Sequence, residues 1–246
     1  MANQSKSRSS SVVVSTAAPE LQLFRIPNIP EIRPGNDLVK IVTGAARRAA
    51  IHVKDGDILV IAQKIVSKAE GALVQLARVK PSPHALAVAA RLKKDPRAVE
   101  VVLQESRRIV RSDPVLIAET RHGFVCANAG VDHSNVPEND VVTLLPRNPD
   151  QSARKLAAAL RKRTGKRVAV IISDTFGRPW RLGLTYVAIG ASGVPVLRDL
   201  RGTRDRDGKS LTATGFPVVV IRGYRYKPSS EPAASVIRPA AEDLFR

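Results

Sequence analysis

The sequence VAVIISDTFGR, residues 168–178, decides the fold class of this chain. Its first five residues are apolar and rich in branched side chains, which is typical of a buried β-strand. Asp174 and Thr175 follow at the end of this expected strand. Ligands bind at the carboxyl ends of strands in open α/β sheets, so the stretch predicts both a central strand and a candidate ligand site. The alternative interpretation is that Asp174 only caps the next turn.

Similar apolar runs recur along the chain and alternate with helical patterns. We expect further strands at residues 58–61, 124–127, 186–189 and 218–221. Four helices are expected. Asn36 can cap the first, which has an apolar stripe through Ala45, and Asp150 can cap the last, which ends at Gly165. The other two begin with a cap followed by a first-turn proline, at Ser82 and Pro83 for the helix to Leu92 and at Asp95 and Pro96 for the helix to near Arg108. This mixture predicts an α/β or α+β fold. Residues 1–20 are expected to be a disordered leader, and residues 21–246 a single domain.

The composition limits the function only loosely. The 246 residues carry a formal net charge of +18, which attracts polyanions such as nucleic acids or phosphorylated small molecules. The basic residues are scattered and no zinc-finger or RRM signature interleaves them, so we do not expect nucleic acid as the partner. Cys126 is the one cysteine, and we expect it to be a buried core thiol. The sequence has no apolar run of eighteen residues, so we expect no membrane span and a cytoplasmic location.

A second polar stretch, NAGVDHSN at residues 128–135, follows the strand expected at residues 124–127. It places Asp132 and the amide of Asn135 beyond that strand, although the same residue types are also common turn formers. Carboxylates are hard oxygen ligands that suit magnesium, and Thr175 offers a further oxygen. Because Asp132 and Asp174 each follow a predicted strand, the two together favour a shared metal site.

A third stretch, QKIVSKAEG at residues 63–71, continues the strand expected at residues 58–61. From this stretch Lys64 and Lys68 would reach the phosphates of a bound ligand. The alternative interpretation is that the stretch is a charged strand and turn without a binding role. The sequence contains no Walker A loop, no dinucleotide-binding glycine pattern and no evident Ser-His-Asp set. If the chain binds a nucleotide, it therefore uses an uncommon scaffold, and no residue is assigned as catalytic.

Taken together, these stretches resemble the coenzyme F-420:L-glutamate ligase (F-420-0:gamma-glutamyl ligase) family. The resemblance covers about residues 21–223, and several long matches in the same order are more specific than any single short motif. The matching strings are IPEI at 29–32, PGNDL at 34–38, GDILVIAQKIVSKAEG at 56–71, NAGVD at 128–132 with Ser134 and Asn135, and SDTFGR at 173–178.

The resemblance implies an α/β fold particular to that family and an intertwined homodimer. It implies a ligase that uses GTP to add L-glutamate to the deazaflavin cofactor F-420-0 through an acyl phosphate. Two magnesium or manganese ions are implied, and potassium is suggested as a further ion. By the same resemblance, metal binding carries over to Asp132, Asp174 and Thr175. Nucleotide contacts carry over to Ile29, Pro30, Glu31, Ile32, Gln63, Lys64, Lys68 and Asn135. The alternative is a catalytically silent homologue that only binds the nucleotide or the cofactor.

One segment departs from the family's pattern. After its Asp-Leu-Arg-Gly string, residues 199–202 here, the family has a helix and a glycine-rich loop that carries further nucleotide contacts and an acidic ligand for the second metal. About twenty residues of that segment are missing between Thr214 and Gly215, the length of one helix and a loop. We expect a true deletion rather than a segment omitted from the numbering. The second metal site is therefore in doubt, whereas Asp132 and Asp174 are unaffected.

The missing segment leads to the first testable prediction. We expect weak or absent ligase turnover, because the γ-phosphate loses part of its electrostatic clamp. Grafting the family's segment between Thr214 and Gly215 should restore turnover, measured as glutamate addition to the cofactor. Full turnover by the ungrafted chain would show that the segment does not have this role.

Overall fold

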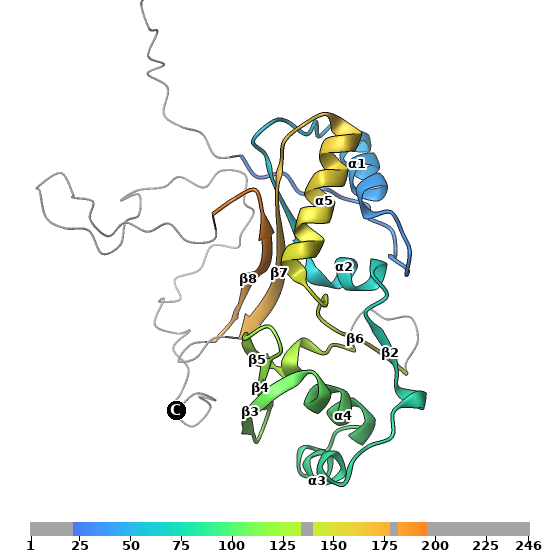
Figure 1. Cartoon of the computed structure of the whole chain (residues 1–246), viewed down its shortest axis with the longest axis vertical. Helices are drawn as coiled ribbons and strands as arrows, with labels where there is room; N and C mark the ends of the chain where they lie inside the picture. Colours follow the sequence, from blue (N-terminus) through green and yellow to red (C-terminus); the bar gives the residue numbers. More distant parts are fainter. Residues whose placement is uncertain (1–21, 134–139, 178–181, 196–246) are drawn as a thin grey trace, which may run out of the picture.

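The computed structural model describes residues 22–133, 140–177 and 182–195 of the chain. Within these residues it has five α-helices, two short 3-10 helices and eight strands in three small sheets (Figure 1). The expected mixture of helices and strands is therefore confirmed. None of the helices in this part of the chain is long and apolar enough to cross a membrane.

The strand expected at residues 168–172 lies at the centre of the principal sheet. This strand, β7 (Ala169–Gly177), pairs in parallel with β1 (Ile58–Ala62) and antiparallel with β8 (Leu184–Ser192). β7 is longer than expected, and Asp174 and Thr175 lie inside it rather than after its end. The reason is that the ladder to β8 continues as far as Gly177 and keeps both residues in extended backbone.

One face of this sheet is covered by helices. α5 (Pro149–Thr164) packs on β7 and β8, and α1 (Leu38–Arg48) packs on α5. The helix approaches the sheet so closely that a Cβ on Gly190 of β8 would lie 2.4 Å from the carbonyl carbon of Pro149. Only glycine fits at this contact. Leu160, Val170 and Ile172 are fully buried between the two layers and form the centre of the core.

Both of these helices begin with a different cap from the one expected. Asp37, not Asn36, caps α1, because its carboxylate accepts a first-turn backbone N–H at 2.9 Å. Asn148, not Asp150, caps α5 in the same way, also at 2.9 Å. Asp150 lies in the first turn instead, where it accepts a hydrogen bond from the backbone N of Ala191 at 2.9 Å and ties α5 to β8.

The opposite face of the sheet is apolar and, among the described residues, uncovered. Four large apolar side chains are exposed on it: Ile58 (53%), Val60 (59%), Leu184 (70%) and Tyr186 (73%). Their pairing partners on β7, residues 169, 171, 175 and 177, are separated by even numbers of residues, so all four point to the same side of the sheet. The strands expected at residues 58–61 and 186–189 are therefore present, but the expectation that they are buried is wrong on this face. An apolar run in the sequence does not show whether one face or both faces of the strand are covered by other parts of the protein.

The chain between β1 and β7 builds a second hydrophobic cluster, which lies below the first in Figure 1. It contains two helices, α3 (Pro83–Leu92) and α4 (Pro96–Gln104), whose expected caps Ser82 and Asp95 are confirmed. Two small antiparallel sheets complete it: one of β3 (Ser106–Ser112), β4 (Leu116–Thr120) and β5 (Val125–Ala127), the other of β2 (Leu73–Gln75) and β6 (Val141–Thr143). The 3-10 helices η1 (Leu76–Arg78) and η2 (Asn128–Gly130) connect these strands to their neighbours.

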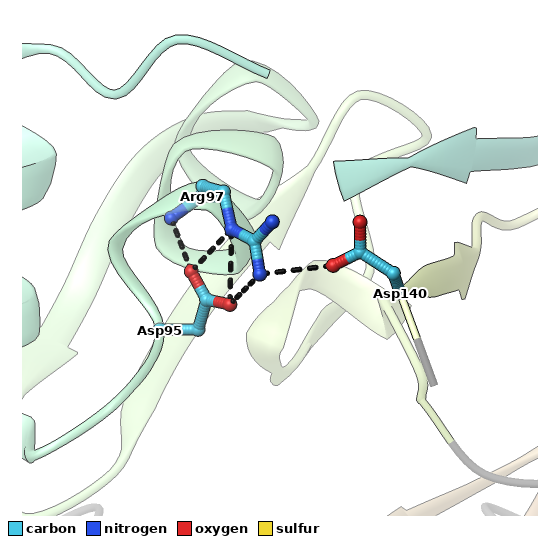
Figure 2. A network of polar contacts seen from close by, with 3 residues as sticks. All are labelled: Asp95, Arg97 and Asp140. Atoms are coloured by element: carbon cyan, nitrogen blue, oxygen red, sulfur yellow. Dashed lines mark hydrogen bonds and ion pairs between the residues drawn. The ribbon is translucent and has the colours of Figure 1, made fainter. Parts of the chain in front are cut away.

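An arginine ties α4 to the beginning of β6. Figure 2 shows Arg97 between two carboxylates, 2.7 Å from Oδ2 of Asp95 and 2.9 Å from Oδ1 of Asp140. Arg97 also holds the pKa of Asp95 below its usual value by donating hydrogen bonds to it. Because these side chains are partly exposed, each ion pair adds little to the stability of the fold. Their main effect is to fix Asp140, which directly precedes β6.

Two expected elements are wrong. The helix expected to reach Arg108 ends at Gln104, because the following residues pair with β4 and form β3. The stretch at residues 63–71, expected to continue a strand, forms α2 (Gln63–Ala69). Gln63, Ala69 and the two lysines of α2 are good helix formers, and the hydroxyl of Ser67 donates to the Gln63 amide oxygen one turn away at 2.8 Å.

Several expectations concern parts of the chain outside the described residues. These are the leader at residues 1–20, the strand at residues 218–221 and the junction of residues 214 and 215. They stay predictions. Four strands are not predicted from the sequence: β2 and β6, which have three residues each, β3, which carries three arginines, and β4.

Candidate functional site

A cavity of about 510 Å³ lies where β1 ends, beside the middle of β7. It brings together every site residue expected from the sequence except Asn135, which lies outside the described residues. The cavity is lined by Ile29, Pro30, Glu31, Ile32, Ala62, Gln63, Lys64, Ile65, Lys68, Asp132, Ser173, Asp174, Thr175 and Tyr186.

The two lysines reach the cavity because α2 begins where β1 ends. Lys64 lies in the first turn of α2, and its Nζ is 2.6 Å from Oδ2 of Asp132. Asp132 is itself held by backbone hydrogen bonds in both directions with Thr143 of β6, at 3.0 and 2.8 Å. An expected metal ligand and an expected phosphate contact are therefore ion-paired with each other.

Lys68 connects the cavity to the N-terminal loop. Its side chain is buried, and its Nζ pairs with the half-exposed carboxylate of Glu31. The loop is fixed further by a 2.9 Å hydrogen bond from the backbone N of Gly35 to the carbonyl oxygen of Ala69. These contacts bring Ile29 and its neighbours to the site, although the amino-acid types of that loop give no signal of a binding role.

Asp174 is the partly buried carboxylate of the site. Burial raises its pKa above the ordinary value of 3.8, the backbone N–H of Thr175 lowers that pKa, and the charge of Asp132 raises it again. Lys64 and Gln63 act in the lowering direction, but the net pKa stays raised. Two carboxylates that repel one another in a half-buried cavity favour a bound cation.

The two carboxylates fit one hard cation. Asp132 and Asp174 supply oxygen atoms, and magnesium is usually held by one or two carboxylates together with water and substrate phosphates. Thr175 also lines the cavity, but as the neighbour of Asp174 on an extended strand it directs its side chain to the other face of the sheet. No group of three or more His, Cys, Asp and Glu side chains gathers in the described part of the chain. The described residues therefore offer a partial set of ligands that substrate oxygens would complete.

Two residues near the site are not predicted from the sequence as part of it. Tyr186 lies opposite Thr175 on β8 and lines the cavity, but its strand shows only an apolar run. Cys126 is buried near Asp174, and burial, followed by the charge of Asp174, raises the pKa of its thiol to about 12. The expectation that Cys126 is a core thiol is confirmed.

A mixed α/β fold that directs two carboxylates and two lysines into one cavity defines an enzyme-like protein whose site suits metal ions and phosphates. Comparison with known families makes this specific. The chain belongs to the F420-0:Gamma-glutamyl ligase family, whose sequence model matches residues 27–223.

Curated relatives agree with this membership. The chain is 44% identical to the Coenzyme F420:L-glutamate ligase of Methanopyrus kandleri, over 93% of this chain and 98% of that protein. It is 41% identical to the protein of the same name from Methanothermobacter thermautotrophicus, over 92% and 99% of the two chains. The Methanocaldococcus jannaschii protein of that name is also 41% identical, over 80% and 88%.

The raised pKa of Asp174 predicts the effect of replacing this residue. Its charge opposes folding at pH values above the raised native pKa, so Asp174→Asn should raise the thermal unfolding midpoint at pH 7 in EDTA. This gain should shrink as the pH falls through the native pKa towards 3.8, because the wild-type carboxyl becomes protonated. Magnesium should stabilise the wild type but not the variant.

Asp113→Asn is the matched control, since Asp113 is exposed and lies on the loop between β3 and β4. It should leave both the metal-free midpoint and the magnesium response unchanged. Equal magnesium responses in wild type and Asp174→Asn would contradict the assignment of Asp174 as a ligand.

Proposed function

We propose that this chain joins L-glutamate to coenzyme F-420-0 at the cavity between β1, α2 and β7, using GTP and acting in the cytoplasm. The observation that carries the proposal is the convergence of Asp132, Asp174, Lys64 and Lys68 on one cavity. Family membership and the printed names of the curated relatives support the same reaction. We propose magnesium or manganese as the metal, with potassium as a further ion.

The proposed reaction has two steps. An oxygen of the terminal carboxylate of the cofactor attacks the γ-phosphorus of GTP, an O–P bond forms, and GDP leaves with the electrons of the broken bond. The amine of L-glutamate then attacks the acyl carbon of this acyl phosphate, inorganic phosphate leaves, and the nitrogen loses a proton as the amide forms. Each step brings anions together, so charge neutralisation and positioning provide most of the catalysis.

The side chains of the cavity suit these tasks. Lys64 and Lys68 bring positive charge to the place where phosphates would lie, and both are held in position by carboxylates. Asp132 and Asp174 would hold one metal ion and Thr175 would offer an oxygen to a further ion, and metal ions bound there would neutralise phosphate charge and polarise phosphoryl oxygens. The apolar residues Ile29, Ile32 and Ile65 line the same cavity and would exclude water from it.

The test of this function measures turnover and nucleotide binding separately. Mass spectrometry of the cofactor after incubation with GTP, L-glutamate and magnesium or manganese should show slow glutamate addition by the chain itself and faster addition once the missing segment is grafted between Thr214 and Gly215. Lys64→Ala and Lys68→Ala should each weaken GTP binding by about 1.5–3 kcal/mol, the worth of a charge-assisted hydrogen bond. Lys80→Ala, which removes an exposed lysine outside the cavity, should bind GTP like the wild type.

The outcomes separate the two candidate functions. Tight GTP binding without any glutamate addition would support a silent nucleotide-binding homologue instead. GTP binding that is the same in the wild type and in both cavity variants would contradict the assignment of Lys64 and Lys68.

We also propose that the chain is a homodimer. The uncovered apolar face of the principal sheet supports this, because monomeric proteins rarely leave several large apolar side chains exposed together. Burying Ile58, Val60, Leu184 and Tyr186 against a second copy would remove that surface from water and would favour association.

Charged substitutions on this face should break the dimer. Ile58→Lys with Leu184→Lys places two cations where an apolar interface is proposed, so we expect a monomer of 26.5 kDa by light scattering, against about twice that mass for the wild type. Leu86→Lys is the control, since Leu86 is 51% exposed on α3, away from this sheet. A wild-type protein of monomeric mass would contradict the proposal.

A further inference from the structure

A second cavity, of about 680 Å³, lies at the other end of the principal sheet from the candidate site. It is a groove between α5, the beginning of β7 and the turn that follows β8. We call it the basic groove, and its lining residues are Arg154, Ala157, Ala158, Arg161, Lys162, Arg167, Val168, Ser192 and Gly193. Val168 is six residues before Asp174, a distance of about 20 Å along a strand. One small ligand would therefore not occupy both cavities.

The rim of the basic groove carries four cations that come from two directions. Arg154 and Arg161 are seven residues apart on α5, so they lie on one side of the helix, about 10 Å apart along its axis. Lys162 follows Arg161, and Arg167 lies on the short connection between α5 and β7. All four side chains are exposed.

These four charges are not neutralised within the described part of the chain. None of the four side chains forms an ion pair there with an Asp or Glu side chain. The carboxylate near this end of the groove, Asp55, accepts a hydrogen bond from the backbone N of Arg167 at 2.7 Å and pairs with Lys166 at 3.7 Å. It therefore contacts the backbone of Arg167 and the neighbouring lysine. The backbone hydrogen bond lowers the pKa of Asp55, and the charge of Arg167 lowers it further without a direct ion pair between the two side chains.

The floor of the basic groove is small and apolar. Ala157, Ala158 and Val168 form much of it, and Gly193 contributes bare backbone at φ +79°. A Cβ at Gly193 would also lie 3.2 Å from Cα of Ala169, so a side chain would be crowded against the backbone at this part of the floor. A concave apolar floor with a cationic rim suits a compact anion whose body rests on the floor and whose charged groups reach the arginines.

We propose that the basic groove binds a small anion with two or more linked phosphate groups, such as a nucleoside polyphosphate or inorganic polyphosphate, separately from the reaction site. Arginine favours phosphate because its planar fork of donors matches two phosphate oxygens at once. Arg154 and Arg161 are spaced to contact different phosphates of one chain, and a cavity of this volume has the size of a small-molecule site. The proposal does not depend on the ligase reaction.

Inorganic tripolyphosphate is the probe, titrated calorimetrically into the full chain in EDTA. Arg154→Gln with Arg161→Gln should weaken binding at least about tenfold, because a lost charge-assisted hydrogen bond corresponds to more than a factor of ten in affinity. Arg147→Gln with Lys155→Gln removes the same charge from exposed positions outside the groove and should bind like the wild type. Lys162→Gln removes one charge from the groove instead of two, so it should weaken tripolyphosphate binding less.

The same titration distinguishes this site from the candidate functional site. Lys64→Ala removes a proposed phosphate contact of the candidate functional site, so tripolyphosphate binding that remains in this variant and is weakened by adding Arg154→Gln with Arg161→Gln belongs to the basic groove. Loss of all binding in Lys64→Ala, an equal loss in both double variants, or no saturable binding by the wild type would each overturn the proposal. A single-stranded oligonucleotide is titrated in the same way. If it binds more tightly than tripolyphosphate and the same groove variants lose that binding, the groove is a nucleic-acid surface and the proposal of a small polyphosphate ligand is wrong.

Discussion

The two hydrogen-bonded ladders of β7 hold the molecule together. On one side β7 pairs with β1, which delivers α2 and its lysines to the end of the sheet, and on the other side it pairs with β8. The same ladders hold the backbone of Asp174 in the extended conformation of a strand, which restricts the positions that its carboxylate can take. Because α5 rests on β7 and β8, this pairing also supports one of the two hydrophobic clusters.

The charged side chains of the site depend on one another, because each charge affects the stability of the others. Lys64 neutralises Asp132, Lys68 neutralises Glu31, and Asp174 stays the carboxylate whose charged form is disfavoured. Removing one member of either ion pair would leave its partner uncompensated in a partly buried place, which is costly. A cation that joins Asp132 and Asp174 would relieve their repulsion, and Lys64 would then be available to an incoming anion.

Much of this arrangement follows from the sequence, and what does not has identifiable causes. Apolar runs predict β1, β7 and β8, and caps with prolines predict α3 and α4, because these signals are local. α2 is misjudged because its polar lysines conceal a short helix whose buried side is only Val66 and its neighbours. The loop at residues 29–32 reaches the site through Glu31 and Gly35, contacts across more than thirty residues that no local pattern encodes.

The parallel pairing of residues 58 and 169 has a consequence for how the chain is made. The whole second cluster is synthesised between two strands that are neighbours in the finished sheet. A nascent chain that ends before β7 already contains Glu31, both lysines and Asp132, but it has neither Asp174 nor the strand that pairs with β1. During translation, the site is therefore completed only after β7 has emerged from the ribosome.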